Sequence, residues 1–238
     1  MLLLIQVISW GEPRMKFVKI DCDIRYAERT KILAGYEAIY SDMLKKAPEQ
    51  AERWVTPGLR IDDKDKKRVM LIDPTRAVIS IEQPPNIGFC RDSIMQFLKS
   101  VDERIGIPNV ARHGIRSTWI FEYQGSFEDL LNKCKQQIFG NSKLAEKVDD
   151  VAAVFDYFIG TDQKIALTTG PMKIEQLKSQ FLSFEPESFP PLFLYVDVDL
   201  GDSGTKKYSA QYLREFFDKA VSEGEKLSME LAKEVGVS

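Results

Sequence analysis

The segment from Val110 to Tyr123 alternates between two kinds of side chain over its whole length. Such a period of two is typical of a long β-strand with one polar face and one apolar face. One face is predicted to carry Arg112, Gly114, Arg116, Thr118 and Glu122, and the other His113, Ile115, Ser117, Trp119, Phe121 and Tyr123. A strand of this kind needs neighbours on both sides and a cover for its apolar face, so the segment favours a large sheet packed against helices.

Two other segments show the same alternation. In Phe17–Tyr26 the apolar positions alternate with a charged face that contains Asp21 and Asp23. In Leu192–Leu200 the polar face carries Tyr195, Asp197 and Asp199. Half-buried strands of this type are found in antiparallel sheets, and the chain is therefore predicted to be an α+β protein with antiparallel sheets covered by helices.

Hairpins and helices separate these strands in a recurring order. Residues 68–72 and 77–83 are predicted to form one hairpin, and residues 151–159 and 164–169 another. Apolar residues at helical spacing follow each hairpin, then a long strand and a second helix. We therefore predict a tandem duplication of a ββαβα unit, covering residues 68–150 and 151–238, whose two units share one core.

Residues 1–67 are predicted to form an N-terminal strand–helix segment and a polar loop. The apolar run at residues 1–10 lacks a basic leading region and is too short to span a membrane, so we expect a strand there. Apolar spacing between Ile32 and Ala47 predicts a helix that ends at Pro48. The polar stretch Glu49–Lys67, with its run of charged residues, is predicted to be a mobile loop.

Composition excludes several classes of protein. The chain has 33 basic and 36 acidic side chains and a formal charge of −3, which argues against a nucleic-acid partner. Its three cysteines, Cys22, Cys90 and Cys134, have no metal-ligand spacing and are expected to be buried free thiols in a reducing compartment. We expect a cytoplasmic protein with no membrane partner, no cofactor and no metal site.

The strands that carry Arg112, Arg116, Asp197 and Asp199 form the candidate ligand-binding surface. Two arginines on one strand face can clamp a carboxylate or a phosphate, because guanidinium offers two parallel donors. Two aspartates on one face can hold Mg²⁺ for phosphoryl transfer, although no glycine-rich phosphate loop accompanies them. The alternative interpretation, which we favour from the sequence, is that the arginines pair with acids on neighbouring strands.

Two further motifs carry little functional weight. His113 falls on the aromatic face of its strand, where a packed and hydrogen-bonded histidine is expected rather than a general base. The string Gly201-Asp202-Ser203-Gly204 matches the nucleophile segment of serine proteases, but the other parts of that catalytic pattern are missing. We predict a polar turn at this string.

The segment Arg112-His113-Gly114-Ile115-Arg116 resembles the Arg-x-Gly-Leu-Arg strand of a sporadically distributed family of uncharacterised prokaryotic proteins. The strand Val196–Asp199, followed by a long helix rich in Phe and Glu, is similar to the C-terminal part of that family. The sequence departs from the family pattern at Ile115 and Ser117, where Leu and Tyr are usual. The resemblance implies no activity.

With no complete catalytic motif, the sequence favours a non-enzymatic binding or interaction protein that forms a homodimer. Its aromatic residues, 14 Phe, 8 Tyr and 3 Trp, are suited to a shared interface. The alternative is a metal-dependent enzyme or binder for phosphorylated or nucleotide ligands. Such a protein would use Asp197 and Asp199 for the metal and Arg112 and Arg116 for the phosphate.

Overall fold

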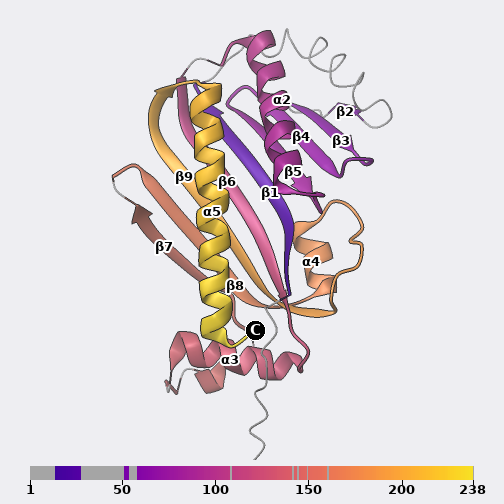
Figure 1. The fold of residues 1–238 in the computed structure, drawn as a ribbon, viewed down its shortest axis with the longest axis vertical. Helices are drawn as coiled ribbons and strands as arrows, with labels where there is room; N and C mark the ends of the chain where they lie inside the picture. Colours follow the sequence, from indigo (N-terminus) through magenta and orange to yellow (C-terminus); the bar gives the residue numbers. More distant parts are fainter. Residues whose placement is uncertain are drawn as a thin grey trace, which may run out of the picture.

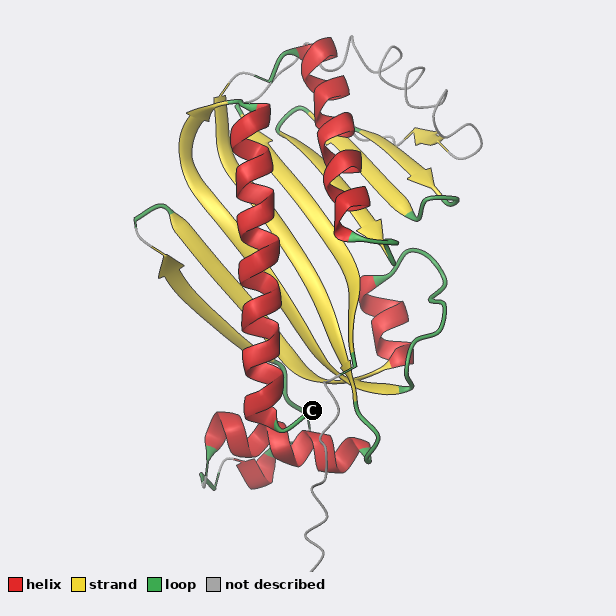
Figure 2. Ribbon diagram, viewed as in Figure 1, coloured by secondary structure: helices red, strands yellow, loops and turns green. Residues whose placement is uncertain are grey.

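A computed structural model describes residues 14–27, 51–53, 58–107, 109–140, 142–143, 145–148, 150–159 and 161–237, with residues 51–53 described by their backbone only. This part of the chain contains both strands and helices (Figures 1 and 2). In chain order they are β1 (Met15–Tyr26), β2 (Ala51–Arg53), β3 (Leu59–Asp63), β4 (Arg68–Asp73), β5 (Arg76–Glu82), α2 (Ile87–Ile105), β6 (Asn109–Glu122), α3 (Phe127–Phe139), a short 3₁₀ turn (Ala145–Lys147), β7 (Ala153–Ile159), β8 (Gln163–Lys173), α4 (Ile174–Phe181), β9 (Leu192–Lys207) and α5 (Ala210–Val235).

All the described strands belong to one antiparallel sheet in the order β2-β3-β4-β5-β1-β6-β9-β8-β7. The long strands β1, β6 and β9 form its centre, and β2 and β7 lie at its two ends. Figure 1 shows α2 and α5 crossing one face of the sheet, with α3 at the end near the C-terminus. The predicted α+β fold with an antiparallel sheet covered by helices is confirmed.

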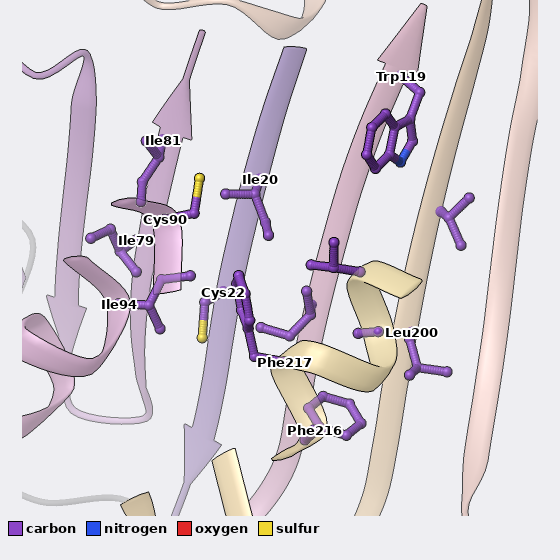
Figure 3. Packing of buried hydrophobic residues seen from close by; sticks show 14 of the residues in the cluster. Ile20, Cys22, Ile79, Ile81, Cys90, Ile94, Trp119, Leu200, Phe216 and Phe217 are labelled. Atoms are coloured by element: carbon purple, nitrogen blue, oxygen red, sulfur yellow. The ribbon is translucent and has the colours of Figure 1, made fainter. Parts of the chain in front are cut away.

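The main hydrophobic core lies between this sheet face and helices α2, α3 and α5. Figure 3 shows Phe216 and Phe217 of α5 facing the side chains of the central strands. Gly224 allows α5 to approach β6, since a Cβ atom there would lie 2.5 Å from Ser117 Oγ. A glycine in the middle of a helix, destabilising by itself, is therefore explained by close helix–sheet packing.

Within the described part of the chain, α4 and the segment that follows it cover one end of the opposite sheet face. There a second, smaller cluster of buried side chains packs Leu177 of α4 against the sheet; its other members are Val18, Ile120, Met172, Phe193 and Tyr195. The buried carboxylate of Glu82 accepts hydrogen bonds from the backbone N–H groups of Ser183 and Phe184, at 2.8–3.1 Å. These bonds fasten the segment after α4 to the end of β5.

Two predictions of secondary structure are wrong. Part of the predicted loop at residues 49–67 forms β2 and β3, and the charged run contains a turn closed by the buried ion pair of Asp63 with Arg68. The residues Gly201–Gly204, predicted to be a polar turn, instead continue strand β9. They do so because β6 pairs with β9 up to Lys207.

Other predictions remain untested. The tandem duplication is not confirmed: β8 and β9 are neighbours, whereas β1 lies between β5 and β6, which would be their counterparts in the first unit. The N-terminal strand at residues 1–10 and the helix between Ile32 and Ala47 lie outside the described residues. Among the helices described, none is long and apolar enough to cross a membrane.

Candidate functional site

The candidate ligand-binding residues lie together on the sheet face opposite α2 and α5. We call this surface the charged face and define it by six side chains: Asp21 and Asp23 of β1, Arg112 and Arg116 of β6, and Asp197 and Asp199 of β9. The strand register aligns Arg116 with Asp21 on one side and with Asp199 on the other. Residues aligned across antiparallel strands point to the same face, so the alternation seen in the sequence predicts this grouping correctly.

Arg112 lies between two carboxylates on different strands. Its Nη1 atom donates to Asp23 Oδ2 at 3.1 Å, and its Nη2 atom donates to both carboxylate oxygens of Asp199 at 2.9–3.0 Å. The guanidinium lies against the sheet over Gly114 and Gly201: a Cβ atom would be 2.3 Å from Arg112 Nη1 at Gly114 and 3.2 Å from Nη2 at Gly201. The glycine of the Arg-x-Gly segment therefore makes room for the arginine two residues before it.

Replacing Gly114 by alanine tests this geometry, because the sign of the change in the free energy of unfolding depends on it. On an open strand the change would stabilise the protein by about 0.5–1 kcal/mol, because glycine loses more entropy on folding. Here we expect the free energy of unfolding to fall by about 1–2 kcal/mol, since the guanidinium must leave its carboxylates. Urea unfolding of the wild-type protein and of Gly114→Ala measures this change in the free energy of unfolding. In an Arg112→Ala background the same change should be neutral or stabilising, and a loss that persists there would contradict this role of Gly114.

Arg116 pairs with the most deeply buried acid of the face. Its Nε atom lies 2.5 Å from Asp197 Oδ2, and the Thr118 hydroxyl donates to Asp197 Oδ1 at 2.8 Å. The Asp197 side chain is 3% exposed and that of Arg116 is 43% exposed. Burial disfavours the charge on Arg116, but the Asp197 carboxylate outweighs it and raises the pKa of the guanidinium. Arg116 thus compensates a carboxylate that would otherwise be buried alone.

The outer acids of the face have partners as well. Asp23 Oδ2 also accepts from Arg25 Nε at 2.8 Å, and Asp21 lies 3.5 Å from Lys19 Nζ. Asp23 Oδ1 is buried without a hydrogen-bond partner among the described residues. The sequence interpretation in which the two arginines pair with acids on neighbouring strands is therefore confirmed.

A second polar cluster lies on the helix-covered face and was not recognised in the sequence. Asp202 of β9 is 1% exposed and accepts from Lys206 Nζ at 2.7 Å and from the hydroxyl of Tyr212 on α5. His113 is aligned with Asp202 across the strands and packs edge-on against the Tyr212 ring, with 5.0 Å between ring centroids. The signal available in the sequence was the charge of Asp202 and Lys206 beside the N-terminus of a helix.

His113 is packed as predicted, but the predicted hydrogen bond is wrong. The residue is completely buried, and neither ring nitrogen has a hydrogen-bond partner in the described part of the chain. Burial lowers the pKa of His113 to about 4; Asp202 opposes this shift and Lys206 adds to it. The imidazole is therefore neutral at physiological pH.

The catalytic alternatives gain no geometric support. In the protease-like string, the Ser203 hydroxyl donates to the backbone oxygen of Asp162, and Asp202 is bound to Lys206 and Tyr212. Within the residues that the structure describes, no three His, Cys, Asp or Glu side chains lie close enough together to hold a metal ion. A Mg²⁺ ion at Asp197 and Asp199 would have to compete with the arginines bound there.

Comparison with known proteins does not assign the chain to a family. No protein-family model matches the chain, and a search of curated proteins finds no match. The resemblance of the Arg112–Arg116 segment to the family of uncharacterised prokaryotic proteins therefore stays a prediction.

Proposed function

We propose that the chain is a non-enzymatic interaction protein that forms a homodimer, and that it acts in the cytoplasm. The observation that carries the proposal is the surface of β7, the strand at one end of the sheet. Val154 is 64% exposed, Phe155 43% and Phe158 71%, and in the part of the chain described these are the large apolar side chains left exposed. Exposed apolar side chains gathered on one strand indicate an interaction surface.

The state of the reactive side chains supports a role without catalysis. The thiols of Cys22, Cys90 and Cys134 are free and buried, and burial raises the pKa of all three. Such thiols are poor nucleophiles at neutral pH. His113 is neutral and enclosed, and both arginines of the charged face are bound to aspartates. Free thiols also fit the reducing conditions of a cytoplasm.

Light scattering over a range of protein concentrations tests the proposal. We expect the average mass of the wild-type protein to rise from 27.2 kDa, the mass of one chain, toward twice that value. Phe158→Asp should remain monomeric, because it places a charge in the apolar surface. The matched control is Gln96→Asp, which adds the same charge at an exposed position on α2 and should leave the association unchanged. A strict monomer at every concentration would contradict the proposal.

Anion binding at the charged face is the second candidate. It is favoured by one observation, the 43% exposure of the Arg116 side chain on the charged face. A phosphate or nucleotide would take guanidinium donors of Arg116 other than Nε, which is bound to Asp197. Calorimetric titration with inorganic phosphate and with a nucleoside triphosphate, each with and without Mg²⁺, tests this. Saturable heat that disappears in Arg116→Gln would support it, and the absence of heat with all of them would leave it without support.

A further inference from the structure

We propose that β7 pairs antiparallel with β7 of a second copy of this chain, about a two-fold axis at Asp156, so that the two sheets join into one. The inference rests on the proposed function and adds the strand, the partner and the register. Among the described strands β7 pairs only with β8, so its outer edge presents backbone donors and acceptors to a further strand.

The side chains of β7 divide between the two faces of the sheet. Val154, Asp156 and Phe158 are aligned with Thr168, Ala166 and Lys164 of β8; of these, Thr168 and Ala166 are in turn aligned with Asp197 and Asp199. These three β7 residues therefore lie on the side of the charged face. Phe155 and Tyr157 lie on the helix-covered side, where Phe155 borders a cavity of about 200 Å³ lined by residues of α3, β8 and α5.

The register follows from the pairs that each alternative would create. A two-fold axis at Asp156 sets Val154 opposite Phe158 of the partner subunit, and Phe155 opposite Tyr157 of the partner subunit. Every apolar side chain then meets another apolar side chain, and aromatic pairs with aromatic or β-branched residues stabilise antiparallel strands. Moving the axis by one residue would instead set Asp156 opposite Val154 or Phe158 of the partner subunit.

Charge complementarity supports the same register. The axis brings the two Asp156 carboxylates together, which would be unfavourable if they were alone. Each carboxylate, however, accepts from its own Lys164 Nζ at 2.7 Å. Two aspartates and two lysines form a cluster without net charge. The strand is thus complementary to itself, which is why we assign a second copy as its partner and not an unrelated chain.

Cysteine cross-linking tests the register. In Asp156→Cys the two new thiols would face each other across the axis, at a spacing that a disulfide can bridge. In the control Val154→Cys the thiols would be about 13 Å apart, four residues along the strand direction, and could not be bridged. The native cysteines are buried, so they should not interfere. Under mild oxidation we expect a covalent dimer from Asp156→Cys and no covalent dimer from Val154→Cys.

Every other outcome overturns the register, the pairing of β7 or the dimer itself. Equal cross-linking of both variants, or cross-linking of Val154→Cys alone, would reject this register. No cross-linking of Asp156→Cys, while light scattering still shows a dimer sensitive to Phe158→Asp, would reject the pairing and leave the proposed function standing. If the wild-type protein is monomeric at every concentration, both proposals fail.

Discussion

Replacing Arg116 by alanine is expected to lower the free energy of unfolding by about 3 kcal/mol. The change removes the guanidinium 2.5 Å from Asp197, whose side chain is 3% exposed. Thr118 remains as the only other side chain that donates to this carboxylate in the described structure. A buried charge without a partner is much more costly than the loss of an exposed ion pair. Urea unfolding at neutral pH measures the effect.

Arg25→Ala is the matched control for this prediction. Arg25 pairs with Asp23 at 2.8 Å, but its side chain is 55% exposed, so its removal should cost less than about 1 kcal/mol. When Asp197→Asn is added to Arg116→Ala, it should recover much of the lost stability, because it removes the uncompensated charge. If Arg116→Ala costs no more than Arg25→Ala, the charged face does not stabilise the sheet as described here.

Acidification is expected to destabilise the protein through His113. The folded protein holds this histidine with a pKa of about 4, against an ordinary value of 6.5. The unfolded chain therefore binds a proton more readily. The contribution of neutral His113 to stability is present above pH 6.5 and is lost as the pH drops toward 4, about 3 kcal/mol in total. The charged and titratable groups that face the ring are Asp202 and Lys206 from β9 and Tyr212 from α5.

The difference between two proteins isolates the effect of this one residue. His113→Phe keeps an aromatic ring beside Tyr212 and Phe216 but cannot be protonated. Between pH 7 and pH 4 the wild-type protein should lose about 3 kcal/mol more than this variant, because the carboxylates titrate in both proteins and His113 only in the wild type. Parallel stability curves for the two proteins would show that His113 is not held neutral by its surroundings.

The alternation of side chains predicted the central strands because each has one apolar face against the helices and one polar face. Residues 109–122 form β6 with the predicted division of faces. The failures occur where charged residues are buried. Asp63 and Arg68 resemble a solvated loop in the sequence, yet each is about 95% buried because they neutralise each other.

The candidate site was predicted in part for a similar reason. The alternation of side chains predicts which residues share a face. The acids on adjacent strands predict that the arginines are paired. The position of Arg112 over Gly114 does not follow, because it depends on the direction of one flexible side chain. The cluster of Asp202, Lys206 and Tyr212 requires α5 to lie across the end of β9, a contact between elements that no local pattern predicts.

We propose that β7 is the surface through which the protein acts, and that the charged face pairs internally and does not bind a nucleotide. Hydrogen–deuterium exchange followed by mass spectrometry tests both parts in one measurement. We predict that peptides covering residues 153–159 become protected as the protein concentration rises, and that a nucleoside triphosphate leaves peptides covering residues 109–122 and 192–207 unchanged. Protection of those two segments by the nucleotide, with no effect of concentration on residues 153–159, would contradict both parts.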